Sequence, residues 1–121
     1  MRTFLILLAT AVPAAAETVT CLWETECYDT NACEETSFET YLTTDGDGYV
    51  WEDISGGTPM IETTLTGPDA PPMRSFAALP AEGNPTTTTV ILDDDGFASF
   101  TQQSYLEAPT TVTYFGSCGL T

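Results

Sequence analysis

The placement of four cysteines limits the possible folds more than any other feature of the sequence. Cys21, Cys27 and Cys33 stand close together near the start, and Cys118 stands almost at the end of the 121 residues. Four cysteines allow three pairings. The spacing C-x5-C-x5-C is not that of a zinc site and the chain has no histidine, so disulfide bonds are favoured over metal ligation.

Disulfides require export, and residues 1–16 have the order of segments found in a secretory signal peptide. Arg2 supplies the positive start, residues 4–12 form an apolar run, and a proline and three alanines lead to a cleavage site before Glu17. The apolar run has about half of the roughly 20 residues needed to cross a bilayer, which disfavours a membrane anchor. The sequence therefore predicts a signal peptide over 1–16 and one secreted or periplasmic domain over 17–121.

The periodicity of the terminal segments favours one cysteine pairing. Cys21 alternates with apolar residues such as Trp23, and Cys118 stands likewise on the apolar face of the last extended segment. If these segments are neighbours in a closed sheet, Cys21 can bond with Cys118, which leaves Cys27 to bond with Cys33. The alternative pairing, Cys21–Cys27 with Cys33–Cys118, stays open.

The mature chain has the composition of a β protein. Threonine, valine and aromatic residues dominate, and Asp-Gly turns at 45–48 and 94–96 are typical of hairpins. The best helical candidate is a single turn near Asp29 to Glu35. We predict a mostly β fold, a small disulfide-stapled, antiparallel up-and-down barrel or sandwich of about eight strands, over residues 19–23, 37–43, 49–54, 60–66, 75–79, 87–92, 97–106 and 111–118.

The charge of the mature chain restricts its partners. Residues 17–121 carry 18 acidic residues and the single base Arg74, a formal net charge of −17. One cation cannot displace counterions from nucleic acid or bind an anionic membrane surface, so we expect neither partner. Solubility in a salty medium explains the acidity most simply. Two more specific interpretations are that the acidity serves to bind a basic secreted protein or a divalent cation.

The composition also restricts catalysis. The chain has no histidine and no lysine, so Ser-His-Asp, Cys-His and Schiff-base chemistry are excluded. Only a pair of carboxylates is left as a catalytic device, and among so many acids a close pair is expected by chance. We therefore predict no catalytic residues, no cofactor and no enzyme activity.

Two groups of residues are candidates for function. The Asp-rich turns supply weak metal ligands, and an ordinary hairpin turn is the simpler interpretation; their aspartates are Asp45, Asp47, Asp93, Asp94 and Asp95. Tyr49 and Trp51 share a strand face with Asp53 and are the best candidates for an exposed aromatic interaction surface. We nevertheless expect at least partial burial of these two rings.

The strand layout and cysteine placement resemble the periplasmic inhibitors of C-type lysozyme, small exported β-barrels in which a bridge joins the terminal strands. That family inserts a Ser-x-x-Gly-x-Lys/Arg-Tyr loop into the cleft of the enzyme. Here Ser55-Gly56-Gly57-Thr58-Pro59 has neither the cation nor the aromatic residue. The resemblance therefore implies an architecture and assigns no functional residue.

From these features we expect a non-catalytic binding or interaction module, with inhibition of a basic secreted hydrolase as its most concrete form. A calcium-binding β module that uses the Asp-rich turns is the alternative. A carboxylate-pair hydrolase is a third hypothesis.

Overall fold

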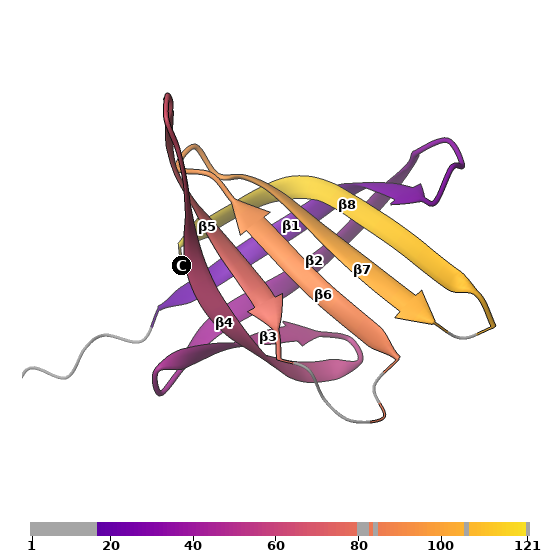
Figure 1. The fold of residues 1–121 in the computed structure, drawn as a ribbon, viewed down its shortest axis with the longest axis horizontal. Coiled ribbons are helices and arrows are strands. Elements are labelled where there is room, and N and C mark those ends of the chain that lie inside the picture. The colour runs from indigo at the N-terminus through magenta and orange to yellow at the C-terminus, as the bar shows by residue number, and fades with distance from the viewer. Residues whose placement is uncertain (1–16, 80–82, 84, 106, 121) are drawn as a thin grey trace, which may run out of the picture.

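Eight antiparallel strands close into one barrel, in which each strand pairs with the next and β8 pairs with β1 (Figure 1). The computed structural model describes residues 17–79, 83, 85–105 and 107–120. The predicted signal peptide over 1–16 lies outside the described residues. The predicted β fold is confirmed, and the barrel is the correct one of the two predicted architectures. The strands are β1 (Thr18–Tyr28), β2 (Glu34–Asp45), β3 (Gly48–Asp53), β4 (Gly56–Gly67), β5 (Ala70–Ala78), β6 (Thr86–Leu92), β7 (Phe97–Tyr105) and β8 (Pro109–Leu120).

Alternating side chains fill the barrel with a single apolar core. Successive residues of a strand point to opposite faces, so every second position of each strand enters the interior. Phe100 lies at the centre of the aromatic packing, with ring centroids 4.5 Å from Trp23 and 5.1 Å from Trp51. The largest fully buried side chains are Trp23, Trp51, Phe76, Leu42, Met60, Val19 and Val90.

Both predicted disulfides are confirmed. Cys21 and Cys118 are directly opposite each other in the β1–β8 ladder and are bonded, across 97 positions of sequence. Closing a loop of that length contributes about 4–5 kcal/mol in the chain-entropy model. The second bond joins Cys27 to Cys33 and closes the β1–β2 turn. Disulfides of this kind are typical of an oxidising compartment outside the cytosol.

The helical turn expected near Asp29 to Glu35 is wrong, because residues 29–33 form the turn between β1 and β2 and β2 begins at Glu34. β1 continues to Tyr28, and the Asp29 amide donates to the Thr111 carbonyl at 2.8 Å. The Asp29 carboxylate accepts from the Thr111 amide at 2.8 Å, which ties the β1–β2 turn to the start of β8.

No helix long and apolar enough to cross a membrane occurs in the part of the chain that the structure describes.

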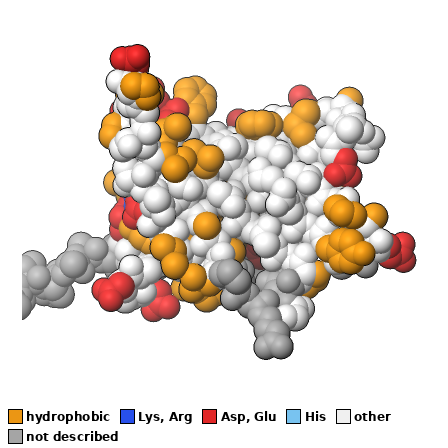
Figure 2. Space-filling model, in the orientation of Figure 1, with side chains coloured by type: hydrophobic (Ala, Val, Ile, Leu, Met, Phe, Trp, Pro, Cys, Tyr) orange, Lys and Arg blue, Asp and Glu red, His pale blue; other side chains and the backbone are white. Residues whose placement is uncertain are grey.

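The charged side chains are unevenly distributed over the surface. In Figure 2, which shows the side on which β5, β6 and β7 lie toward the viewer, acidic side chains lie mainly around the margin. The middle of this face is occupied by uncharged polar and apolar side chains.

A close backbone approach joins β1 to β8 beside the Cys21–Cys118 bond. Gly116 is paired with Trp23, and a Cβ atom at Gly116 would stand 2.0 Å from the Leu22 carbonyl oxygen. No side chain fits at that distance. The pairing register shifts just beyond it, between Trp23 and Thr25, as in a β-bulge.

We therefore predict that Gly116→Ala destabilises the protein by about 3 kcal/mol, because β1 and β8 must separate to admit the methyl group. Gly119→Ala, on the same strand, is the matched control, since nothing lies within 4 Å of a Cβ there. Urea unfolding of the oxidised proteins measures both changes. Equal stabilities for the two variants would contradict the close approach.

Candidate functional site

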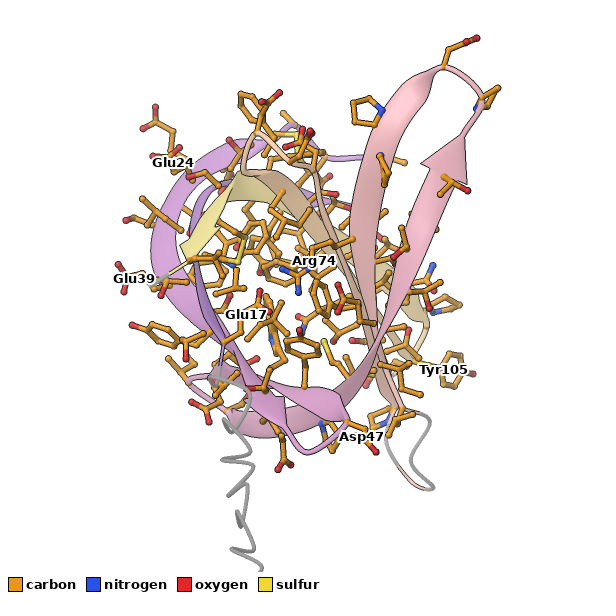
Figure 3. The ribbon with its side chains drawn as sticks, turned by 90° about the vertical axis from the view of Figure 1, so that its left-hand side faces the viewer. Glu17, Glu24, Glu39, Asp47, Arg74 and Tyr105 are labelled. Atoms are coloured by element: carbon orange, nitrogen blue, oxygen red, sulfur yellow. A yellow bond between two sulfur atoms is a disulfide. The ribbon has the colours of Figure 1, made fainter. Side chains whose placement is uncertain are left out.

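The barrel has two different ends, and Arg74 marks one of them. Viewed from this end, Arg74 and Glu17 lie within the ring of strands, whereas Glu24 and Glu39 point away from it (Figure 3). The β2–β3, β4–β5 and β6–β7 turns lie at this Arg74 end. The β1–β2, β3–β4 and β7–β8 turns lie at the opposite end, which we call the Glu26 end after an inward-facing residue of β1.

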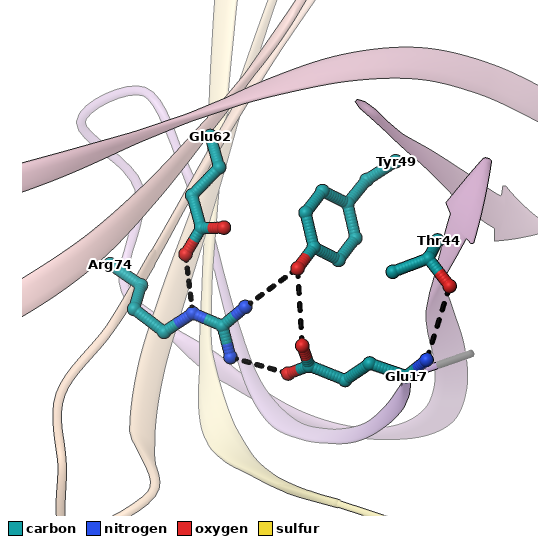
Figure 4. Close-up of polar contacts among 5 residues, drawn as sticks. All are labelled: Glu17, Thr44, Tyr49, Glu62 and Arg74. Carbon is teal, nitrogen blue, oxygen red and sulfur yellow. Dashed lines mark hydrogen bonds and ion pairs between the residues drawn. The ribbon is translucent and has the colours of Figure 1, made fainter. Parts of the chain in front are cut away.

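At the Arg74 end, a network of charged hydrogen bonds fills the interior above the core (Figure 4). Arg74 Nε donates to Glu62 Oε1 at 2.5 Å, and Arg74 Nη1 donates to Glu17 Oε1 at 2.6 Å. Arg74 Nη2 donates to the Tyr49 hydroxyl at 3.1 Å, which itself donates to Glu17 Oε2 at 3.1 Å. The guanidinium also lies 5.1 Å from the Phe76 ring centroid. Strands β3, β4 and β5 and the residue before β1 are thereby held together.

Each member of this network stabilises the charge state of the others. The hydrogen bond to Glu62 raises the pKa of Arg74, against the opposing effect of burial. The hydrogen bond from Arg74 lowers the pKa of Glu17, whereas burial and the bond to Glu17 raise the pKa of Tyr49. Arg74, the only base in residues 17–121, is thus fully engaged in holding the barrel together.

The Glu26 end contains a recess of about 420 Å³ between the turns. Its floor is aromatic: the Phe100 and Tyr114 rings are stacked with centroids 4.4 Å apart, and Phe38 meets Tyr114 edge-on at 5.0 Å. Thr40, at 0 % exposure, accepts a 2.9 Å hydrogen bond from the Trp23 indole and fixes the base of the recess.

Two carboxylates stand at the rim of this recess, Glu26 from β1 and Asp53 from β3. Asp53 Oδ1 accepts from both the amide and the hydroxyl of Ser55, at 2.8 and 2.6 Å, which orients the carboxylate at the β3–β4 turn. Glu26 faces Tyr114 across the β1–β8 ladder. Burial, followed by hydrogen bonding to Glu26, raises the pKa of Tyr114.

A second, polar depression of about 330 Å³ adjoins the recess. The two share Asp53, Ser55 and Gln102, and the second adds hydroxyl groups such as those of Thr88 and Ser104. The Glu26 end therefore presents an aromatic floor, two carboxylates, an amide and several hydroxyl groups. Arg74 is bonded at the other end, so no cation of residues 17–121 neutralises Glu26 or Asp53.

The interaction surface predicted at Tyr49 and Trp51 is wrong. Trp51 is 1 % exposed in the core, and its indole nitrogen has no hydrogen-bond partner among the described residues. Tyr49 is half-buried and belongs to the Arg74 network. The face shared with Asp53 is the inner face of the barrel, so the expected burial of both rings is confirmed.

The Asp-rich turns lie at the Arg74 end and act as turns. Asp93 Oδ1 accepts from the Asp95 and Phe97 amides, at 3.0 and 2.9 Å, and so closes the β6–β7 hairpin. Asp93, Asp94 and Asp95 line a depression to which Asp45 and Asp47 do not contribute. Over the described ranges, no group of three or more acidic, cysteine or histidine residues is arranged to hold a metal ion.

Sequence reasoning missed most of the recess. Gln102 lies two residues after Phe100 in β7, so the two side chains share a face, and this signal places Gln102 inside the barrel. Glu26 carries no such signal, because the bulge between Trp23 and Thr25 reverses the alternation that holds for the first part of β1.

Comparison with protein-family models, with curated proteins and with solved structures finds no match for this chain. The likeness to the periplasmic lysozyme inhibitors therefore receives no support from these comparisons.

We predict that Arg74→Met lowers the free energy of unfolding by about 2 kcal/mol at pH 7. Removing one partner from a buried pair costs about 3–5 kcal/mol. The side chains here are about 30 % exposed, so water screens part of the interaction. Replacing both carboxylates as well, in Arg74→Met with Glu17→Gln and Glu62→Gln, should restore much of the loss.

The difference between the wild type and Arg74→Met should depend on pH. The pKa of Glu17 is lowered in the folded state from an ordinary value of 4.5, so its stabilising effect is complete above that value and is lost as the pH falls through the folded pKa. Urea unfolding between pH 7 and 3 should show the difference shrinking below about pH 4.5. A constant difference over this range would show that Glu17 is not the partner that matters.

Proposed function

We propose that the protein is a non-catalytic binding module that engages a basic secreted protein through the recess at the Glu26 end of the barrel. The observation that carries this proposal is the presence of Glu26 and Asp53 at the rim of a recess with an aromatic floor, without any cation of the mature chain to neutralise them.

The chemistry of the recess suits a cationic side chain. Carboxylates bind ammonium and guanidinium groups through charge-assisted hydrogen bonds, and aromatic rings attract the same groups within about 6 Å of their centroids. Phe38 and Tyr114 supply rings beside Glu26. A volume of about 420 Å³ is within the usual range for ligand pockets and has room for one lysine or arginine side chain.

The net charge of the whole domain supports a basic partner. Eighteen acidic residues against one base create a negative field that attracts a basic protein and speeds its association. Field alone gives little specificity, which must come from a shaped site such as the recess. Inhibition of a basic secreted hydrolase is the most concrete form of this function.

The location and the absence of catalysis belong to the same proposal. Two disulfides and the predicted signal peptide over 1–16 support an oxidising site outside the cytosol. A chain without histidine or lysine lacks the usual general bases and nucleophile activators, which supports a binding role over an enzymatic one.

The test is the affinity of oxidised residues 17–121 for a panel of basic secreted hydrolases at about 0.3 M salt, where exposed charges are largely screened. For the partner that binds, Glu26→Gln with Asp53→Asn should weaken the affinity at least tenfold, which is about 1.4 kcal/mol.

The matched control removes the same charge from the outside of the barrel. Glu24→Gln with Glu52→Asn changes two exposed carboxylates and should alter the affinity by less than about threefold. Equal losses in the two double variants would show that bulk charge alone attracts the partner. No binding to any member of the panel would contradict the proposed partner class.

A further inference from the structure

The outer face of β4 to β8 carries no charged side chain among the described residues. Every acid from Met60 onward in the described chain is in the interior, as Glu62 is, or in a turn between strands, as Asp69, Asp93 and Glu107 are. The outward positions are serine, threonine, alanine, glutamine or apolar residues. We call this face, from Ile61 on β4 to Ser117 on β8, the neutral wall.

The opposite side of the barrel has the reverse character. Glu24, Glu35, Glu39 and Glu52 are exposed on β1, β2 and β3. Figure 3 shows Glu24 and Glu39 pointing outward from that side. In a chain with 18 acids and one base after residue 16, a face of five strands without a single charge is the exceptional part of the surface.

The neutral wall also contains an apolar groove. Met73, Ile91, Phe97 and Phe115, one from each of four adjacent strands, line a groove of about 290 Å³. Asp93 of the β6–β7 turn also lines it, and its carboxylate accepts hydrogen bonds from the Asp95 and Phe97 amides. Phe97 is 71 % exposed and Phe115 is 49 % exposed, so both rings stand beside the groove in contact with solvent. Exposed aromatic side chains next to an apolar groove are typical of protein interfaces.

We propose that the neutral wall is the interface of a homodimer. Two copies of a chain with this charge repel each other when their acidic faces meet, and the neutral wall is the face through which they can approach with the fewest carboxylates between them. A basic partner would gain nothing from the neutral wall, because it offers no negative charge. In a two-fold arrangement the same residues serve both copies, and Phe97 or Phe115 of each can enter the groove of the other.

The size of the neutral wall fits this role. The shortest of its strands, β6, has 7 residues, which span about 23 Å at about 3.3 Å per residue. Five strands about 4.8 Å apart give a similar width. The resulting area, about 500 Å², is smaller than the roughly 800 Å² per partner of a standard interface and corresponds to a weak dimer. This proposal does not depend on the function of the recess, which lies at the end of the barrel and not on its side.

Sedimentation of oxidised residues 17–121 over a range of concentrations tests the proposal. We expect a dimer at about 100 µM protein, with a dissociation constant that falls as salt rises from about 0.05 to 0.5 M, because screening weakens the remaining repulsion between the copies. Phe97→Ser with Phe115→Ser should raise the dissociation constant at least tenfold. Thr89→Glu, which places a charge on the neutral wall, should do the same without removing an aromatic ring.

The matched control is Tyr41→Ser, because Tyr41 is a 37 % exposed aromatic residue on β2, outside the neutral wall. It should leave the dissociation constant unchanged, and thermal unfolding confirms that all variants are folded. A protein that stays monomeric at about 100 µM in about 0.5 M salt overturns the proposal. So does a dimer that the neutral-wall variants leave intact, or one that Tyr41→Ser disrupts equally.

Discussion

The pairing of β8 with β1 is the contact on which the rest of the structure depends, because it turns an open sheet into a barrel. The pairing is secured by the Cys21–Cys118 bond and by the approach of Gly116 to the Leu22 carbonyl, where no side chain fits. Just beyond, the bulge in β1 turns Glu26 inward, where uninterrupted alternation would have turned it outward. The same short stretch therefore closes the barrel and places an acid in the recess.

The single base in residues 17–121 explains why the two ends of the barrel differ. Inward-facing carboxylates need a cation, another hydrogen-bond donor or water, and Arg74 satisfies Glu17 and Glu62 at one end. Nothing comparable is available for Glu26 and Asp53. Their position at a partly solvated rim makes this tolerable for folding, because water can solvate the charges. The same position leaves them accessible to a cation of a partner. The lack of a second base therefore both limits how many carboxylates the interior can hold and leaves the recess with unneutralised acids.

Much of the fold could be predicted from the sequence, because strand alternation is a local property. Cys21 and Cys118 each stand on the apolar face of a terminal strand, and this position identified the disulfide pairing. The Asp-Gly turns marked the β2–β3 and β6–β7 hairpins. Two kinds of information were not local. Alternation shows that Tyr49 and Trp51 share a face but not which face is inside, and a bulge has no clear sequence signal, so Glu26 was missed.

The acids fall into two groups, one that keeps the protein dispersed and one that stands at the recess. Acids in the turns and on β1 to β3 keep the protein soluble and give it a negative field, while those at the Glu26 end stand at the rim of the recess. The neutral wall serves neither need, and threonine and serine alone would have kept it soluble. Phe97 and Phe115 stand there in solvent beside an apolar groove, although either could be polar without cost to the core. Exposure of both rings on this side is what a self-associating surface requires, because apolar burial there competes least with charge repulsion.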